Sequence, residues 1–254
     1  MTEPTASFPS SASASSMSVT SQVRVAALIP AAGSGQRLGR GPKAFVEIAD
    51  ETLLARAVKA FCEDADEIVV AVPAELQAEA CALLPAGVKV IVGGSTRQAT
   101  VYKLLQATTA DVVLIHDAAR PFLARDIIQR TRDAVIQQGA ASVVIRVADS
   151  LVAAANGATH DRSALRAVQT PQGFLRPLIV KAHEYAQTQH LQVTDDASLV
   201  RAIGHDVALV EGSSWLMKVT EPAQLEMARA LATYWDAQRS YATAVNTNVN
   251  PASD

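Results

Sequence analysis

The residues whose types and spacing could support chemistry begin with Pro30-Ala31-Ala32-Gly33-Ser34-Gly35-Gln36-Arg37, followed closely by Pro42-Lys43. An apolar run ends at this loop, which combines glycines with two cations, Arg37 and Lys43. Glycine has no Cβ, so the backbone N–H groups of such a loop can approach an anion closely. The loop therefore favours a nucleoside triphosphate that reacts at phosphorus, where positioning and charge neutralisation supply most of the rate.

The glycine spacing of this loop also resembles a dinucleotide-binding turn, but two features argue against a dehydrogenase. Pro42 interrupts the helix that should begin there, and the second expected strand ends in Val70-Ala71-Val72-Pro73, without an acid for a ribose hydroxyl. The Gly-Lys-Ser/Thr order of the common P-loop is absent as well. A structural turn is the alternative, and Arg37 and Lys43 favour a phosphate loop over it.

A second candidate is Gly93-Gly94-Ser95-Thr96-Arg97, which ends one expected strand and opens a helix. Two consecutive glycines permit a flat ring to approach the backbone, and Thr100 lies one helical turn further on. The segment could form a pocket for a nucleotide base. Alternatively, Ser95 or Thr96 serves only as the N-cap of the helix.

The third candidate is His116-Asp117-Ala118-Ala119-Arg120-Pro121, at the end of an apolar strand. Asp117 could accept a hydrogen bond from a hydroxyl group or hold a divalent cation. Arg120 could bind phosphate or only brace the loop through an ion pair. We interpret His116 as a hydrogen-bonded histidine at a strand end, without a role as a base.

A further cation, Lys218, lies close to the end of the fold in Lys218-Val219-Thr220-Glu221-Pro222. Thr220 and Pro222 are typical of the N-cap and the first turn of a last helix. From these residues alone, Lys218 could equally be an exposed surface lysine.

The elements that must position these residues alternate between strand and helix. Strands are predicted at 23–29, 67–72, 88–92, 112–116, 142–147 and 207–210, and helices at 52–62, 74–83, 97–107, 124–138 and 177–189. This alternation predicts an α/β fold, a Rossmann-like and mostly parallel sheet with helices on both faces. Ligands of such sheets bind beyond the carboxyl ends of the strands, which is where the first three candidate segments fall.

Residues 148–166 interrupt the alternation. They hold a short apolar run and then Asn156-Gly157, a pair that favours a two-residue hairpin turn. We predict a protruding β-arm here. An isolated hairpin is marginally stable in water, so the arm is expected to pack on a second subunit.

Composition limits the remaining possibilities. The 254 residues have a formal net charge of −3 and no basic block, which argues against nucleic acid or an anionic membrane as a partner. No apolar run is long enough to cross a bilayer. Cys62 and Cys81 are too few for a disulfide framework or a metal cluster. Residues 1–22 and 241–254 are predicted to be disordered tails of one domain, 23–240, in a cytoplasmic protein.

Taken together and in order, these motifs resemble the 2-C-methyl-D-erythritol 4-phosphate cytidylyltransferases of the non-mevalonate isoprenoid pathway, over about residues 23–235. Thr170-Pro171-Gln172 and Thr194-Asp195-Asp196-Ala197 complete the resemblance. It implies transfer of CMP from CTP to methylerythritol phosphate with release of pyrophosphate. It also implies a homodimer made through the arm.

The resemblance implies three groups of site residues. The catalytic group would be Arg37, Lys43 and Lys218, which would neutralise the triphosphate and the transition state. The cytidine part of CTP would contact Ala31, Ala32, Gly33, Gly94, Ser95 and Thr100. The methylerythritol phosphate would contact Asp117, Arg120, Thr170 and Thr194, and Ser150 and Arg162 on the arm would reach the partner subunit's substrate. An acid is common in the family at position 95 and a threonine at position 150.

The expected reaction is an in-line attack by the substrate phosphate oxygen on the α-phosphorus of CTP, without a covalent enzyme intermediate. The nucleophile is already an anion, so a strong base is unnecessary, and Mg²⁺ is expected to bind the phosphates with few protein ligands. Two alternatives remain open from the residues: a cytidylyltransferase for another polyol phosphate such as ribitol 5-phosphate, and a non-catalytic nucleotide-binding module.

Overall fold

The central element of the fold is a seven-stranded sheet in the order β11-β7-β10-β6-β1-β4-β5. The structure is a computed structural model, and it describes residues 22–33 and 42–248. The strands of the sheet are β1 (Val25–Pro30), β4 (Glu67–Val72), β5 (Lys89–Val92), β6 (Val112–Ile115), β7 (Ala140–Arg146), β10 (Arg166–Leu175) and β11 (Ala208–Glu211). Only β10 runs antiparallel to its neighbours, so the predicted α/β fold with a mostly parallel sheet is confirmed.

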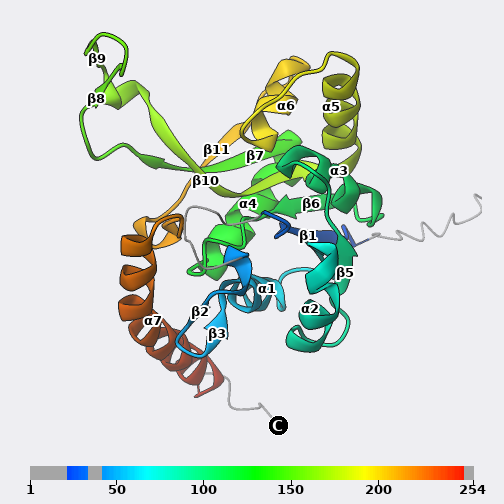
Figure 1. The fold of residues 1–254 in the computed structure, drawn as a ribbon, viewed down its shortest axis with the longest axis vertical. Coiled ribbons are helices and arrows are strands. Elements are labelled where there is room, and N and C mark those ends of the chain that lie inside the picture. The colour runs from blue at the N-terminus through cyan, green and yellow to red at the C-terminus, as the bar shows by residue number, and fades with distance from the viewer. Residues whose placement is uncertain (1–21, 34–41, 249–254) are drawn as a thin grey trace, which may run out of the picture.

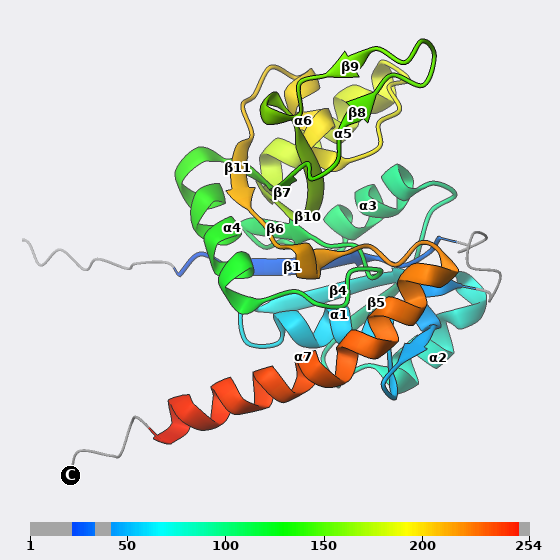
Figure 2. The same ribbon diagram turned by 90° about the vertical axis from the view of Figure 1, so that its left-hand side faces the viewer.

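Helices cover both faces of the sheet (Figure 2). The helices are α1 (Leu53–Phe61), α2 (Gln77–Leu83), α3 (Arg97–Gln106), α4 (Arg125–Gln138), α5 (Arg176–Thr188), α6 (Asp196–Ala202) and α7 (Pro222–Asn248). Side chains of β1 alternate between the two faces: Ala27 and Ile29 pack with α1, α2 and α4, whereas Ala26 and Leu28 pack with α3, α5 and α6. This alternation follows from the period of two in a strand and explains why β1 is apolar throughout.

A third apolar cluster joins α7 to the small hairpin of β2 (Glu47–Ile48) and β3 (Glu51–Thr52). Phe122 and Trp235 are buried in it, with their ring centroids 5.5 Å apart. The cluster holds the last helix against the segment that follows the first loop. Over the described residues, no helix combines the length with the apolar character that crossing a bilayer requires.

The predicted arm is present and projects from the body of the molecule (Figure 1). It contains β8 (Leu151–Val152) paired antiparallel with β9 (Thr159–His160), then η4 (Arg162–Ala164). The predicted two-residue turn is wrong, because the N–H of Ala153 donates to the Ala158 oxygen (2.8 Å) and four residues lie between them. Gly157 has a φ of 70° within this loop, a conformation that glycine adopts without strain.

Strand β10 and helix α6 are absent from the sequence prediction. Pro171 lies where the pairing of β10 with β7 shifts register, between Val168 and Gln172. Proline cannot donate to a ladder and is found at such irregularities, so its presence disguises the strand. Helix α6 has only seven residues, too few for a clear apolar period.

The last helix differs from the prediction in its N-cap and in its C-terminal end. It begins at Pro222 as expected, but the Thr220 hydroxyl donates to Oε1 of Gln224 (2.7 Å) and so does not act as a simple N-cap acceptor. The helix continues to Asn248, so residues 241–248 are helical although the predicted domain ends at 240. Neither glycine nor proline occurs between Pro222 and Pro251, so nothing in the sequence stops the helix earlier. The predicted tail at 1–22 lies almost entirely outside the described residues.

Candidate active site

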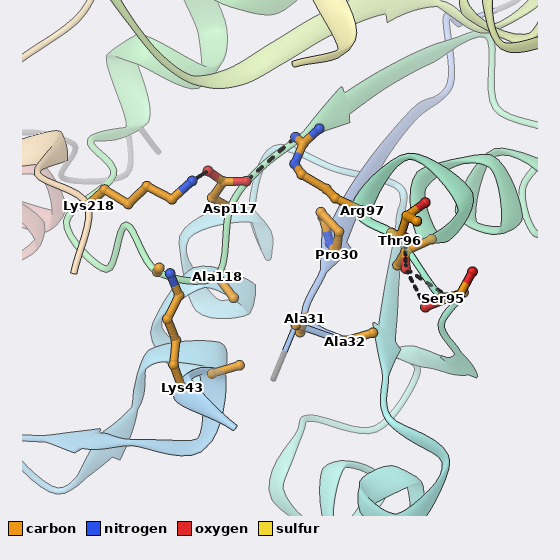
Figure 3. A pocket seen from close by; sticks show the side chains of 15 residues that line it. Pro30, Ala31, Ala32, Lys43, Ser95, Thr96, Arg97, Asp117, Ala118 and Lys218 are labelled. Carbon is orange, nitrogen blue, oxygen red and sulfur yellow. Dashed lines mark hydrogen bonds and ion pairs between the residues drawn. The ribbon is translucent and has the colours of Figure 1, made fainter. Parts of the chain in front are cut away.

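A cavity of about 420 Å³ opens where β1, β5 and β6 end (Figure 3). This is the carboxyl edge of the parallel strands, the expected position for a ligand. The residues that line the cavity are Pro30, Ala31, Ala32, Gly33, Lys43, Ala44, Gly94, Ser95, Thr96, Arg97, Thr100, Asp117, Ala118, Ala119 and Lys218. Segments far apart in the chain therefore meet at one site.

The first loop contributes Ala31, Ala32 and Gly33 directly after β1. The Ala31 N–H donates to the Ala71 oxygen (2.7 Å), which extends the pairing of β1 with β4 into the loop. Lys43 opens the short helix η2 (Lys43–Phe45) after Pro42, and it lines the cavity. Arg37, the third predicted catalytic cation, lies outside the described residues.

The double-glycine loop packs tightly against the first loop. A Cβ on Gly93 would lie 2.3 Å from the Cβ of Ala32, so only glycine allows the two loops to approach this closely. A Cβ on Gly94 would similarly lie 2.8 Å from that of Ala99. Gly94 lines the cavity, and Gly93 allows the loop that carries it to lie against the first loop.

The hydroxyl groups of Thr96 and Thr100 hold this loop in shape. The Thr96 hydroxyl caps α3 by accepting from the Ala99 N–H (3.0 Å). The Thr100 hydroxyl accepts from the Gly94 N–H (3.0 Å) and donates to the Thr96 oxygen (2.8 Å). Thr100 therefore uses its hydroxyl to hold the loop, while Ser95 lines the cavity from the same loop.

Opposite charges alternate across the top of the cavity, from Lys218 through Asp117 to Arg97 (Figure 3). Lys218 Nζ lies 2.6 Å from Asp117 Oδ2, and an Arg97 nitrogen lies 3.6 Å from Asp117 Oδ1. Burial opposes ionisation of Asp117, but Arg97 and Lys218 outweigh it and hold the pKa of this carboxyl far below its usual range. Asp117 is therefore a carboxylate at neutral pH.

Arg120 braces the segments around the site and does not line the cavity. Its guanidinium donates to the backbone oxygens of Leu216 (2.5 Å) and Val168 (3.2 Å), and Nε lies 4.0 Å from Asp117. Burial lowers the pKa of Arg120, although Asp117 counteracts it. These contacts brace the loop, and the contact of Arg120 with the substrate phosphate stays a prediction.

Thr170, on the neighbouring strand β10, supports Asp117 and also contacts His116. The Thr170 hydroxyl accepts from the Asp117 N–H (3.1 Å) and lies 3.0 Å from Nδ1 of His116. Nε2 of His116 lies 3.1 Å from the Arg120 oxygen, so both ring nitrogens have partners. Burial lowers the pKa of His116 to about 4, so the ring is neutral at pH 7.

The predicted arm residues do not join this cavity within one chain. Ser150 and Arg162 are exposed on the arm, and Thr194 is exposed ahead of α6. Arg162 donates to the Ala148 oxygen. It lines a second cavity of about 370 Å³ at the base of the arm, together with Arg146, Val147, Ala148, Ser163 and Arg166.

Among the charged residues that line the cavity, Arg97 was not predicted from the sequence. It is the first residue of α3, and it contacts Asp196 (2.8 Å) as well as Asp117. The sequence did contain a signal for this residue, because Arg97 ends the segment Gly93-Gly94-Ser95-Thr96-Arg97. At a helix N-terminus this residue is easily taken for an exposed one, because nothing local reveals its two distant carboxylates.

Comparisons with known proteins point to one family over most of the chain. A family model described as 2-C-methyl-D-erythritol 4-phosphate cytidylyltransferase matches residues 25–233. The enzyme of that name from Deinococcus radiodurans is 51% identical over 222 residues, covering 85% of this chain and 93% of the relative. That from Thermus thermophilus is 46% identical over 220 residues, covering 85% of this chain and 100% of the relative.

Solved structures agree with the sequence relatives. The crystal structure of the 2-C-methyl-D-erythritol 4-phosphate cytidylyltransferase from Thermus thermophilus superimposes with a TM-score of 0.74 at 42% identity. It covers 83% of this chain and 100% of that one. Similarity thus extends over nearly all of the described fold.

Proposed function

The chain belongs to the 2-C-methyl-D-erythritol 4-phosphate cytidylyltransferase family, and on that premise we propose how its own residues carry out the reaction. The enzyme transfers CMP from CTP to 2-C-methyl-D-erythritol 4-phosphate, releases pyrophosphate and forms 4-diphosphocytidyl-2-C-methyl-D-erythritol. Both reactants are anions, so their mutual repulsion is the obstacle that the site must overcome.

The observation that carries our proposal is that Lys43 and Lys218 line the same cavity as the glycine loops. Two cations there would neutralise the triphosphate and stabilise the additional charge of the transition state. Arg37 is proposed as a third cation from the first loop. The cytidine part of CTP would rest against Ala31, Ala32, Gly33, Gly94 and Ser95, with Thr100 holding the loop beneath it.

The proposed chemical step is an in-line attack by the phosphate oxygen of the acceptor on the α-phosphorus of CTP. The new bond joins that oxygen to phosphorus, and pyrophosphate takes the electrons of the bond that breaks. No base is required, because the attacking oxygen is already an anion at pH 7. The neutral, fully hydrogen-bonded His116 is consistent with this assignment, since it has no ring nitrogen to offer.

Mg²⁺ is proposed as the metal cofactor, and the donor set of the cavity fits it. Asp117 is the one carboxylate among the described residues that line the cavity. Mg²⁺ in nucleotide sites binds through one or two carboxylates together with phosphates and waters. Asp117 would contribute at most one such ligand. When bound, the metal would withdraw charge from the phosphate oxygens.

The acceptor is proposed to complete its site across a homodimer. Ser150, Arg162 and the arm cavity are outside the nucleotide cavity of their own chain. The arm and the start of β10 expose apolar side chains at Leu151, Val152, Leu165 and Val168, which a partner would cover. Asp117, Thr170 and Thr194 would meet the substrate from the body of the fold. A cytoplasmic location is proposed as well, and the free thiols of Cys62 and Cys81 are consistent with a reducing compartment.

A pyrophosphate-release assay tests the proposal directly. The purified protein is offered CTP, ATP, GTP or UTP, each with 2-C-methyl-D-erythritol 4-phosphate or with ribitol 5-phosphate. Release is expected with CTP and 2-C-methyl-D-erythritol 4-phosphate only. Faster release with ribitol 5-phosphate would contradict the acceptor assignment. Binding of CTP without any acceptor-dependent release would indicate a non-catalytic nucleotide-binding protein.

A further inference from the structure

Arg97 is held between two carboxylates that belong to different parts of the chain. One of its terminal nitrogens lies 2.8 Å from Asp196 Oδ2, and the other lies 3.6 Å from Asp117 Oδ1. The second oxygen of Asp117 faces Lys218 Nζ at 2.6 Å. Charges therefore alternate over four residues, from Lys218 through Asp117 and Arg97 to Asp196.

Asp196 is a rigid anchor for this row of charges. It is only 1% exposed and is the first residue of α6. The N–H groups of Asp196 and Ala197 both donate to Oε1 of Gln172 (2.9 and 3.1 Å). Gln172 in turn donates to the Ser142 hydroxyl (3.0 Å), so α6 is tied to β10 and β7. His183 lies 3.6 Å from the other carboxylate oxygen of Asp196.

Such a geometry restricts Arg97 to a single orientation. A guanidinium presents its donors in a planar fork, so it can engage two carboxylates at once, which a lysine ammonium on its flexible stem does less well. Burial opposes the charge of Arg97, but Asp196 and Asp117 outweigh it and raise its pKa above the usual value. The side chain is thus a fixed positive charge at the edge of the cavity.

We infer that Arg97 is a positioning residue for the reaction. It acts through Asp117, and it sets both the orientation of Lys218 and how much of the Lys218 positive charge remains to act on the phosphates. A carboxylate 2.6 Å from an ammonium group offsets most of its positive charge. Arg97 also attracts the Asp117 carboxylate, so this carboxylate offsets less of the positive charge of Lys218. More of the Lys218 charge is therefore left to act on the phosphates. This inference rests on the role proposed above for Lys218.

The decisive comparison is between Asp196→Asn and the double variant Arg97→Gln/Asp196→Asn. Arg97→Gln alone would leave Asp196 as an unpaired buried charge and could unfold the protein. The double variant removes one charge of each sign and keeps the interior balanced. We expect kcat of the double variant to be about tenfold lower than that of Asp196→Asn, as is typical of coupled charges, with melting temperatures that match. Values of kcat within twofold of each other would overturn the inference.

A second comparison separates positioning from direct contact with the substrate. In an Asp117→Asn background, Arg97 loses the carboxylate through which it acts, so Asp117→Asn/Asp196→Asn and Asp117→Asn/Arg97→Gln/Asp196→Asn should differ in kcat by less than twofold. An undiminished loss in that background would mean that Arg97 contacts the substrate itself, and the inference would be wrong.

Lys218→Ala distinguishes a failure of this inference from a failure of the premise. If Lys218→Ala keeps the wild-type kcat, both the proposed role of Lys218 and the role of Arg97 are overturned. If Lys218→Ala is impaired while the Arg97 comparison shows no loss, only the inference on Arg97 fails.

Discussion

Lys43 and Lys218 come from opposite parts of the chain, yet both line the cavity beyond β1 and β6. Lys43 is placed by η2, directly after the first loop, and Lys218 is placed by the segment that leads from η5 (Ser214–Leu216) into α7. The Val219 N–H donates to the Ala119 oxygen (2.8 Å), which fixes that segment beside Asp117. Their charge can therefore act on one ligand.

Lys43→Ala and Lys218→Ala are each expected to lower kcat by about 10²–10³-fold, the typical loss of one preorganised group that stabilises transition-state charge. The measurement is steady-state pyrophosphate release with both substrates saturating. Lys59→Ala is the matched control, because Lys59 is an exposed lysine of α1 outside the cavity, paired with Glu51. Wild-type turnover by Lys43→Ala would exclude the first loop from the mechanism.

His116 gives the protein a pH-dependent stability of known sign. Burial lowers the pKa of the His116 ring in the folded state to about 4, whereas a histidine in the unfolded chain has its ordinary pKa of about 6.5. Between these values the unfolded state binds more protons than the folded state. The contribution of His116 is thus fully present above about pH 6.5 and is lost as the pH falls towards 4.

We expect the free energy of unfolding to fall by about 3 kcal/mol from this residue over that window. His116→Gln should flatten the dependence, since glutamine does not titrate. Urea unfolding of both proteins at a series of pH values from 7 to 4.5, at one protein concentration, measures the difference. Parallel curves for the two proteins would contradict the prediction.

The arm is the element on which the proposed dimer depends. It projects from the sheet (Figure 1), and Arg162 lines the cavity at its base with Arg146 and Arg166. Three arginines around one cavity favour an anion. The Asp161 side chain accepts from the Ser163 N–H (2.9 Å), which starts η4 and sets the backbone at Arg162.

Arg162→Ala is expected to raise KM for the sugar phosphate by about 10- to 100-fold, the cost of a lost hydrogen bond between charged groups, and to leave KM for CTP unchanged. Initial-rate measurements with each substrate varied in turn provide the test. Arg229→Ala on α7, which removes an arginine paired with Glu226, serves as the control. An unchanged KM for the sugar phosphate would mean that the arm does not reach the site.

At the scale of the whole molecule, the two halves of the proposed site lie in different places on one chain. The nucleotide cavity sits at the sheet edge, whereas Ser150 and Arg162 lie on the arm and line no part of that cavity. The exposed apolar residues of the arm form a surface whose contact with water is unfavourable. A symmetric dimer would bury this surface and join the two halves.

If the proposed dimer forms, Val152→Glu is expected to convert it to a monomer and to reduce activity, because the charge would lie in the interface. Val152 is 60% exposed, so the fold of a single chain should tolerate the change. Size-exclusion chromatography with light scattering gives the mass. Met227→Glu, at a similarly exposed apolar residue on α7, should leave both the mass and the activity unchanged. A wild-type protein with the mass of one chain would refute the dimer.

The sequence by itself determined the six parallel strands of the main sheet, most of the helices and the sheet edge at which the motifs meet, because periodicity and turn residues are local signals. It also identified Lys43 and Asp117 as candidates, since each directly follows a recognisable motif. Only the tertiary structure decided where the antiparallel β10 is inserted and that Arg120 and Thr100 bind the backbone. The same holds for Arg97 between Asp117 and Asp196. The physical reason is that a polar side chain takes its role from the partners around it in space, and those partners can be as distant in the chain as Lys218 is from Asp117.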